Sequence, residues 1–247
     1  IEILNLAMSK QKIWNYALIG GIILVLIIAL ISINSYIQKR KDNKIIAAEK
    51  AKSDALLLNT LPLKVVNDLK TYGKTEPESF DNVTVYFSDV VGFTTISSTL
   101  EPKTLINALS EMFTNFDSIM TRWQCERIKT IGDAYLAVSG MPEKNERHAY
   151  NMLRAAIDIR EYLIKRNETA EIKFRCRIGI NTGRVVGGIV GTKKYLYDVF
   201  GDTINTASRM ESNSEPLKIN ISESTYELVK DMFILTDRGI MEVKGKG

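Results

Sequence analysis

Two aspartates stand at turns directly beside apolar segments, where their side chains would be free to bind a ligand. Asp89 ends one such segment, and the turn that follows it contains Gly92, Phe93 and Thr94. Asp133 comes between two short strand-like segments, a spacing typical of a hairpin. Two carboxylates beside a glycine-containing turn with free backbone N–H groups suit Mg²⁺ and a triphosphate. Taken singly, each aspartate is more simply interpreted as a turn residue.

Other polar residues are informative mainly by their spacing. Asn205 and Arg209 are four residues apart in a segment of helical composition, so their side chains would project from the same face of a helix. Alone, such a pair could equally belong to a solvated helix surface. Lys129 lies in a short segment with the pattern of a strand and on its own would be an exposed lysine of that strand. His148 is the only histidine; we expect it to be exposed at the polar start of a helix, without a functional role.

Strand and helix patterns alternate in the second half of the chain. Strand composition is found at 83–90, 126–131, 134–139, 173–181, 185–190 and 219–222, with further strands expected after 230, and helical periodicity at 102–122, 145–165 and 202–211. Turn signals at Gly132-Asp133 and Thr182-Gly183 predict two hairpins. The order strand, helix, strand, strand, helix, strand predicts an α+β fold with a ferredoxin-like antiparallel sheet and helices on one face.

An apolar segment near the N-terminus predicts a transmembrane helix over residues 14–37. Residues 17–33 are apolar or glycine apart from Ser32, and Trp14, Tyr16 and Tyr36 fall where interfacial aromatic residues lie. A signal peptide and a buried core helix are the alternatives, but no small-residue cleavage site follows. Basic residues do follow, namely Lys39, Arg40, Lys41 and Lys44, and they account for most of the net charge of +4. They place the C-terminal side in the cytoplasm, at a membrane surface, and give no reason to invoke nucleic acid.

The remaining segments divide the chain into regions. Residues 1–13 would be an extracytoplasmic or upstream remnant of a longer protein, 38–70 a helical stalk, 71–82 a loop and 83–247 one domain. The stalk carries a heptad-like seam that consists of Ala47, Ala51, Asp54, Leu58, Leu61 and Val65. Pro62 should kink or restart its helix. A parallel two-stranded stalk and a solvated amphipathic linker both fit this pattern.

Four motifs occur in order along the second half of the chain. They are FSDVVGFT at 87–94, RIKTIGDAYLAVSG at 127–140, YDVFGDTINTASRMES at 197–212 and VKGKG at 243–247. Residues 83–247 thereby resemble the catalytic domain of class III nucleotide cyclases, which implies the class III cyclase fold. The resemblance covers about two thirds of the chain.

The resemblance implies a role for each matching residue. Metal binding, with two Mg²⁺ or Mn²⁺ ions per active site, would fall to Asp89 and Asp133, and purine recognition to Lys129 and Asp198. Catalysis would depend on Asn205, which orients the ribose, and Arg209, which stabilises the transition state. Further substrate binding would involve Lys244, at the terminal phosphates, with Phe93 and Thr94 in the first motif.

The purine pair favours ATP as the substrate. Lys129 can only donate and ionised Asp198 can only accept hydrogen bonds, which matches the ring-nitrogen acceptor and exocyclic amino donor of adenine. Family members that use GTP carry an acidic residue and a cysteine at these positions. We therefore expect an adenylyl cyclase that converts ATP to 3′,5′-cyclic AMP and pyrophosphate. A guanylyl cyclase and a catalytically silent nucleotide-binding module are the alternatives.

The resemblance also implies a homodimer with active sites shared between chains. One chain would supply Asp89 and Asp133, and its partner would supply the purine-binding pair with Asn205 and Arg209. Since each chain has the full set, a symmetric dimer would contain two complete sites and a monomer none. The sequence does not indicate which stimulus the protein senses.

Overall fold

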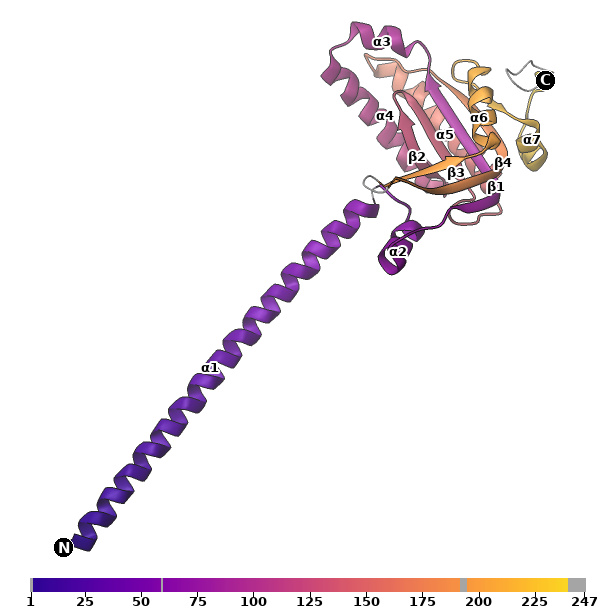
Figure 1. Ribbon diagram of the computed structural model, residues 1–247. Helices are drawn as coiled ribbons and strands as arrows, with labels where there is room; N and C mark the ends of the chain where they lie inside the picture. The colour runs from indigo at the N-terminus through magenta and orange to yellow at the C-terminus, as the bar shows by residue number, and fades with distance from the viewer. Residues whose placement is uncertain (1, 59, 192–194, 240–247) are drawn as a thin grey trace. The chain divides into compact units, whose positions relative to one another are not determined.

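The computed structural model describes residues 2–58, 60–191 and 195–239, without the side chains of residues 2–7 and 9. The chain divides into two compact units, residues 1–59 and 60–247. One unit is a long helix, and the other contains the strands and the remaining helices (Figure 1).

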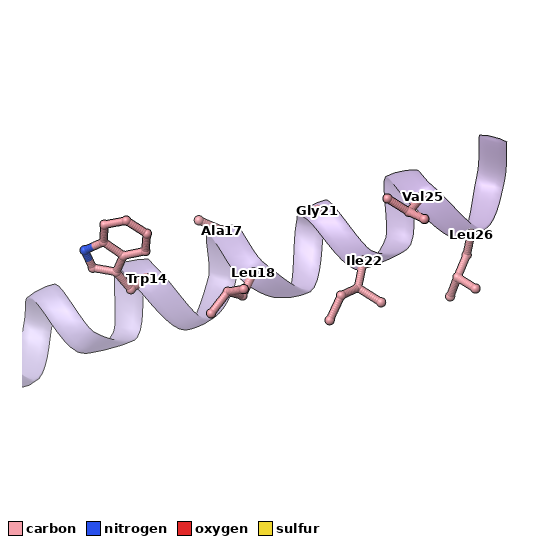
Figure 2. A pocket seen from close by; sticks show the side chains of 7 residues that line it. All are labelled: Trp14, Ala17, Leu18, Gly21, Ile22, Val25 and Leu26. Atoms are coloured by element: carbon pink, nitrogen blue, oxygen red, sulfur yellow. The ribbon is translucent and has the colours of Figure 1, made fainter. Parts of the chain in front are cut away.

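The first unit is a single helix, α1 (Glu2–Leu58). At 1.5 Å per residue it is about 85 Å long, and every described side chain from residue 10 to residue 53 is exposed. Figure 2 shows part of its apolar surface, where Leu18, Ile22 and Leu26 project from one side and Gly21 leaves the backbone uncovered. By length and composition alone, α1 could cross a membrane, although a signal sequence near the N-terminus would pass the same test.

The predicted heptad seam does not run through one continuous helix. The first helix ends at Leu58, and α2 (Leu63–Tyr72) begins directly after Pro62, as expected for a residue that restarts a helix. Leu61 and Val65, the last two members of the seam, are 3% and 7% exposed and belong to the core of the second unit. They are therefore unavailable for a stalk, and only the part of the seam within α1 remains a prediction.

The second unit is built on one sheet with the strand order β2-β3-β1-β4-β5, and β6 pairs with β4. The strands are β1 (Glu78–Val90), β2 (Glu126–Ile131), β3 (Ala134–Ser139), β4 (Cys176–Val190), β5 (Leu196–Phe200) and β6 (Ile219–Ile221). All pairings are antiparallel except that of β4 with β6. The predicted fold class is confirmed, although β1 begins at Glu78, within the segment that we expected to be a loop, and the described residues after 230 contain no strand.

Helices cover both faces of this sheet (Figure 1). Helices α4 (Pro102–Arg122), α5 (His148–Thr169) and α7 (Glu223–Val229) enclose the main apolar core together with Ile178 and Ile180 of β4. Because side chains alternate along a strand, Gly179 faces the other way. There α6 (Asp202–Ser212) lies so close that a Cβ on Gly179 would be 2.0 Å from the backbone nitrogen of Glu211. Helices therefore cover both faces of the sheet, whereas the sequence predicted helices on one face only.

The hairpin predicted at Thr182-Gly183 is wrong. Strand β4 runs through both residues and pairs with β1 from Glu78↔Gly187 to Val90↔Cys176. The glycine is required by packing and not by a turn, since a Cβ at Gly183 would lie 2.7 Å from Oγ1 of Thr203 on α6. Pattern alone could not distinguish a turn glycine from a glycine beneath a helix.

His148 is also not where we expected it. It is 7% exposed, and its Nδ1 lies 2.7 Å from Oγ1 of Thr84. Thr84 in turn contacts Thr182, and Thr182 contacts Thr225 of α7, both at 2.9 Å. These hydroxyl groups join α5, β1, β4 and α7 within the core. A buried imidazole with such partners has a structural role, and burial lowers its pKa below the ordinary value of 6.5.

We predict that His148 makes folding sensitive to acid. Because the unfolded chain binds a proton near pH 6.5 while the buried ring stays neutral, the stability due to His148 is fully present above that pH and is lost as the pH falls. Thermal unfolding of the detergent-solubilised chain between pH 7.5 and 5.5 would measure this loss. The variant His148→Gln should lack this component, and an identical pH dependence in both proteins would contradict the prediction.

Candidate active site

The structure brings the two predicted metal-binding aspartates together. Asp89 is the penultimate residue of β1, and Asp133 lies at the β2–β3 turn after Gly132, which has a φ of 64°. The backbone N–H of Val90 donates to Oδ2 of Asp133 over 3.3 Å. Burial, and then hydrogen bonding and charge repulsion from Asp133, raise the pKa of Asp89 to about 6. The two carboxylates therefore lie close enough to repel each other, and a cation bound by both would relieve that repulsion.

An arginine that the sequence analysis missed lies beside this pair. Arg177 of β4 stands directly opposite Asp89 in the strand register. Its Nη2 lies 3.3 Å from Oδ2 of Asp89, and its Nε donates to Oε1 of Glu211 over 2.8 Å. A charged residue between Cys176 and Ile178 was the available signal, but only the pairing of β1 with β4 shows its partner.

These carboxylates fit a divalent cation. Among the described residues no group of three or more His, Cys, Asp or Glu side chains could hold a metal ion. However, Mg²⁺ is usually held by only one or two carboxylates together with substrate phosphates and water. Asp89 and Asp133 have the oxygen donors for that arrangement, and their mutual repulsion would favour a bound cation.

The turn after Asp89 leads into a short helix that begins four residues further along the chain. Gly92 has a φ of 72° and caps α3 (Phe93–Thr99), and its carbonyl accepts hydrogen bonds from the amides of Thr95 and Ile96. The amides of Phe93 and Thr94 thus belong to the first turn, where N–H groups have no intrahelical partner. The ring of Phe93 packs against the core. Only its backbone is therefore suited to contact a substrate.

The second predicted pair, Lys129 and Asp198, is in direct contact. Nζ of Lys129 lies 2.5 Å from Oδ2 of Asp198, and the backbone N–H of Val199 donates to Oδ1 of the same aspartate over 2.9 Å. Asp198 is only 8% exposed. Lys129 is partly buried, so the simple interpretation as an exposed strand lysine is wrong.

This contact joins two strands that are far apart in the sheet order. Lys129 lies on β2 and Asp198 on β5, at opposite ends of the path β2-β3-β1-β4-β5, so the twisted sheet must curl until its edges meet. The register of β2 against β3 shifts between Arg127 and Lys129. Such a bulge directs the side chain that follows it to the other face of the strand. Here the side chain that follows is that of Lys129.

The two predicted catalytic residues lie on α6. Asn205 is exposed, and Arg209 follows one turn later on the same side of the helix. Among the described residues, Nη1 of Arg209 is buried and has no hydrogen-bond partner. A buried guanidinium nitrogen without a partner is costly, and an anionic ligand would satisfy it.

Within one chain, the predicted metal-binding pair and the predicted purine-binding pair are separate groups. No hydrogen bond or ion pair of the described part of the chain joins the Asp89–Asp133 pair to the Lys129–Asp198 pair. Lys244 lies outside the described residues, so the structure says nothing of its place.

The fold and these site residues have counterparts in known proteins. The family model described as adenylate and guanylate cyclase catalytic domain matches residues 75–247. The chain therefore belongs to the class III nucleotide cyclase family. Human atrial natriuretic peptide receptor 2 is 42% identical over 204 residues, and mouse retinal guanylyl cyclase 2 is 43% identical over 205 residues. Each match covers 81% of this chain but only 20% and 18% of those proteins, so the chain spans about a fifth of their length.

Solved cyclase domains have the same fold. The catalytic core of a rhodopsin-guanylyl cyclase with converted specificity, in complex with ATPαS, is 42% identical with a TM-score of 0.66, and the match covers 70% of this chain and 94% of that one. The guanylate cyclase domain of RhGC from Catenaria anguillulae, in complex with GTP, is 40% identical with a TM-score of 0.66, covering 69% and 93%. The adenylyl cyclase CyaB from P. aeruginosa is 30% identical with a TM-score of 0.64, covering 70% and 91%.

We predict that Asp89→Ala and Asp133→Ala each lower cyclase turnover by at least about 100-fold, since even residues behind metal ligands typically contribute about 10- to 100-fold. Turnover is measured as cyclic nucleotide formed with Mn²⁺. Asp81→Ala is the matched control, because its carboxylate is exposed and bonded to Arg184 at 2.6 Å. Retention of more than a few per cent of activity in either test variant, with the control active, would contradict the two-carboxylate site.

Proposed function

We propose that the chain is an adenylyl cyclase, which converts ATP to 3′,5′-cyclic AMP and pyrophosphate. The observation that carries the proposal is the contact of Lys129 with Asp198, a donor-only group beside an acceptor-only group. Adenine would replace this contact, with its ring nitrogen accepting from Lys129 and its amino group donating to Asp198. Guanine presents the opposite pattern, a carbonyl acceptor and a ring N–H donor.

Burial makes this pair selective. Asp198 is 8% exposed and is fixed by the backbone of Val199, so it cannot turn away from an unsuitable base. Each unmatched buried polar group costs about 1–3 kcal/mol. Two mismatches would therefore favour adenine over guanine by about 100-fold or more.

A guanylyl cyclase is the second candidate, and the comparisons favour it. The curated relatives named above are a natriuretic peptide receptor and a retinal guanylyl cyclase, at 42% and 43% identity. Overall identity, however, reports on the whole domain, whereas the choice of purine depends on few side chains. The rhodopsin-guanylyl cyclase with converted specificity was solved with ATPαS, so a framework 42% identical to this one can hold an adenine nucleotide.

The reaction that we propose is in-line attack of the ribose 3′-oxygen on the α-phosphorus. When bound, two Mg²⁺ or Mn²⁺ ions would acidify the 3′-hydroxyl and offset phosphate charge. Asp89 and Asp133 would hold them. Asn205 would orient the ribose, and the unpartnered Nη1 of Arg209 would bind the α-phosphoryl group as negative charge develops there. Lys244 would bind the terminal phosphates.

We further propose that two chains share each active site. The metal-binding pair and the purine-binding pair of one chain are not connected, and each would be completed by the other chain. Apolar side chains of β4 and β5 are 38–49% exposed and would suit an interface between copies; they are Val186, Val190, Leu196 and Phe200. A guanylyl cyclase domain 38% identical to this chain has been solved as a dimer, described as non-canonical.

Helix α1 would anchor the enzyme to a membrane by a single pass, with the catalytic unit in the cytoplasm. The proposal rests on the exposed apolar surface of α1 and on the basic residues 39–41 that follow it. One relative named above is a receptor, but it matches only in part.

Purine selectivity can be tested directly. The purified chain should form cyclic AMP from ATP about 100-fold more efficiently than cyclic GMP from GTP. The double variant Lys129→Glu with Asp198→Cys should lose ATP turnover and gain weak GTP turnover, because its polar groups then match guanine. Products are identified by mass spectrometry. Preference of the unaltered chain for GTP would support the guanylyl cyclase, and no turnover of either would support a silent nucleotide-binding module.

Sharing of the active site predicts complementation between inactive chains. Asp89→Ala and Arg209→Ala should each abolish activity alone. Their heterodimer would contain one site with both lesions and one with neither, so heterodimers purified through two different tags should recover about half of the normal activity. Recovery of none, in confirmed heterodimers, would mean that each site lies within a single chain.

A further inference from the structure

Glu211 is a buried carboxylate to which the proposed mechanism gives no role. It lies near the end of α6, two residues after Arg209, and is 4% exposed. Its Oε1 accepts from Nε of Arg177 over 2.8 Å, and its Oε2 accepts from Oγ of Ser212 over 3.1 Å. Both oxygens therefore have partners, and the charge is balanced by a guanidinium that also reaches Asp89.

The position of Glu211 is fixed by backbone packing. Gly179 of β4 lies directly beneath it, and a Cβ there would be 2.0 Å from the Glu211 nitrogen and 2.4 Å from the carbonyl oxygen of Ala207. Since α6 cannot move closer to β4, the carboxylate is presented to Arg177 from a rigid support. Arg177 comes from the same strand two residues earlier, so both partners belong to one packed unit.

The guanidinium of Arg177 is divided between two carboxylates. It contacts Glu211 through Nε at 2.8 Å and Asp89 through Nη2 at 3.3 Å, so the contact with Glu211 is the shorter one. Without its hydrogen bond to Glu211, Arg177 could instead donate two parallel hydrogen bonds to Asp89. That arrangement would occupy both oxygens of Asp89 and oppose the binding of a cation.

We propose that Glu211 is a positioning residue for the metal-binding carboxylates. It holds Arg177 by Nε and thereby limits the hold of Arg177 on Asp89, which keeps the Asp89 oxygens available to Mg²⁺ or Mn²⁺. This inference rests on the proposed metal site and is independent of the choice between ATP and GTP.

A consequence follows for a dimer with shared sites. Asp89 would serve one active site, whereas Asn205 and Arg209 of the same chain would serve the other. Glu211 and Arg177 form the ionic connection between Asp89 and α6 within that chain. Metal binding in one site is thus linked physically to the helix that carries the catalytic residues of the second site.

The first test measures cation binding without turnover. Electron paramagnetic resonance would quantify Mn²⁺ bound by the full chain in the presence of 3′-deoxy-ATP and, in a parallel series, 3′-deoxy-GTP, beyond that bound by the nucleotide alone. Both analogues lack the attacking hydroxyl group. We expect Glu211→Gln to weaken Mn²⁺ binding by about 10-fold or more, as is typical for residues behind metal ligands. Glu211→Asp, which keeps the charge, should recover part of the affinity.

Glu215→Gln is the matched control. It removes the same charge from a nearby position, but the side chain of Glu215 is 64% exposed and its ionic partner Arg238 is 3.7 Å away. Its Mn²⁺ affinity should be unchanged. Normal Mn²⁺ affinity in Glu211→Gln, or equal losses in Glu211→Gln and Glu215→Gln, would overturn the proposal. If Glu211→Gln does not fold, Glu211→Asp must show an intermediate loss, and normal affinity there would overturn it as well.

The second test places the substitution on one chain of a heterodimer. With Arg209→Ala on one chain and Asp89→Ala on the other, the single intact site uses Asp89 of the first chain. Glu211→Gln on that first chain should raise the Mn²⁺ concentration needed for half-maximal activity by about 10-fold. The same substitution on the second chain should leave this concentration nearly unchanged. An equal rise from either chain would contradict action through Arg177 on Asp89.

The two proposals fail in different ways. Absence of chain-dependent Mn²⁺ binding in the unaltered protein would remove the metal site and this inference with it. If the chain turns over GTP and its Mn²⁺ binding depends on Glu211, only the proposed purine preference is overturned. The inference about Glu211 then stands.

Discussion

The antiparallel pairing of β1 with β4 determines where the other elements of the catalytic unit can lie. The register runs from Glu78↔Gly187 to Val90↔Cys176 and sets Arg177 opposite Asp89. The same alternation turns Ile178 toward α5 and Gly179 toward α6, so one strand supports a helix on each face. A slip by one residue would exchange the two faces. It would place the charged pair in the apolar core and separate α6 from the sheet, so the site and the fold depend on one register.

The proposed purine-binding pair depends on the curvature of the sheet and not on a single strand. Lys129 and Asp198 are 69 residues apart in sequence, on edge strands that meet because the sheet curls. An ion pair of this kind is of little use for stability, since removal of two charges from water offsets much of their attraction. In the proposed role, its value lies in placing a donor and an acceptor side by side, so that a base able to pair with both would replace their contact. Partial burial then makes the choice of base matter energetically.

The sequence predicted the parts of the site that depend on short segments. Asn205 and Arg209 share a helix, and Gly132-Asp133 forms a real turn, so local spacing was sufficient for both. Prediction failed where a residue owes its place to a distant partner. Gly183 was assigned to a turn because the helix above it was not visible in the pattern, and His148 was expected at the surface because its hydroxyl partner Thr84 lies 64 residues away. Arg177 and Glu211 were missed for the same reason, being 34 residues apart.

The charges of a single chain explain why neither half of the proposed site is complete. Around the end of β1, three carboxylates face one guanidinium, since Arg177 is shared by Asp89 and Glu211 while Asp133 adds a further charge. This half is acidic and suited to cations. On α6, the unpartnered Nη1 of Arg209 leaves a positive charge without a counterion among the described residues. A metal–nucleotide complex carries the opposite charges: its cations could bind to the carboxylates, and its phosphates could bind to Arg209. Such a complex would neutralise both halves only if they faced each other, which gives two chains an electrostatic reason to close around the substrate.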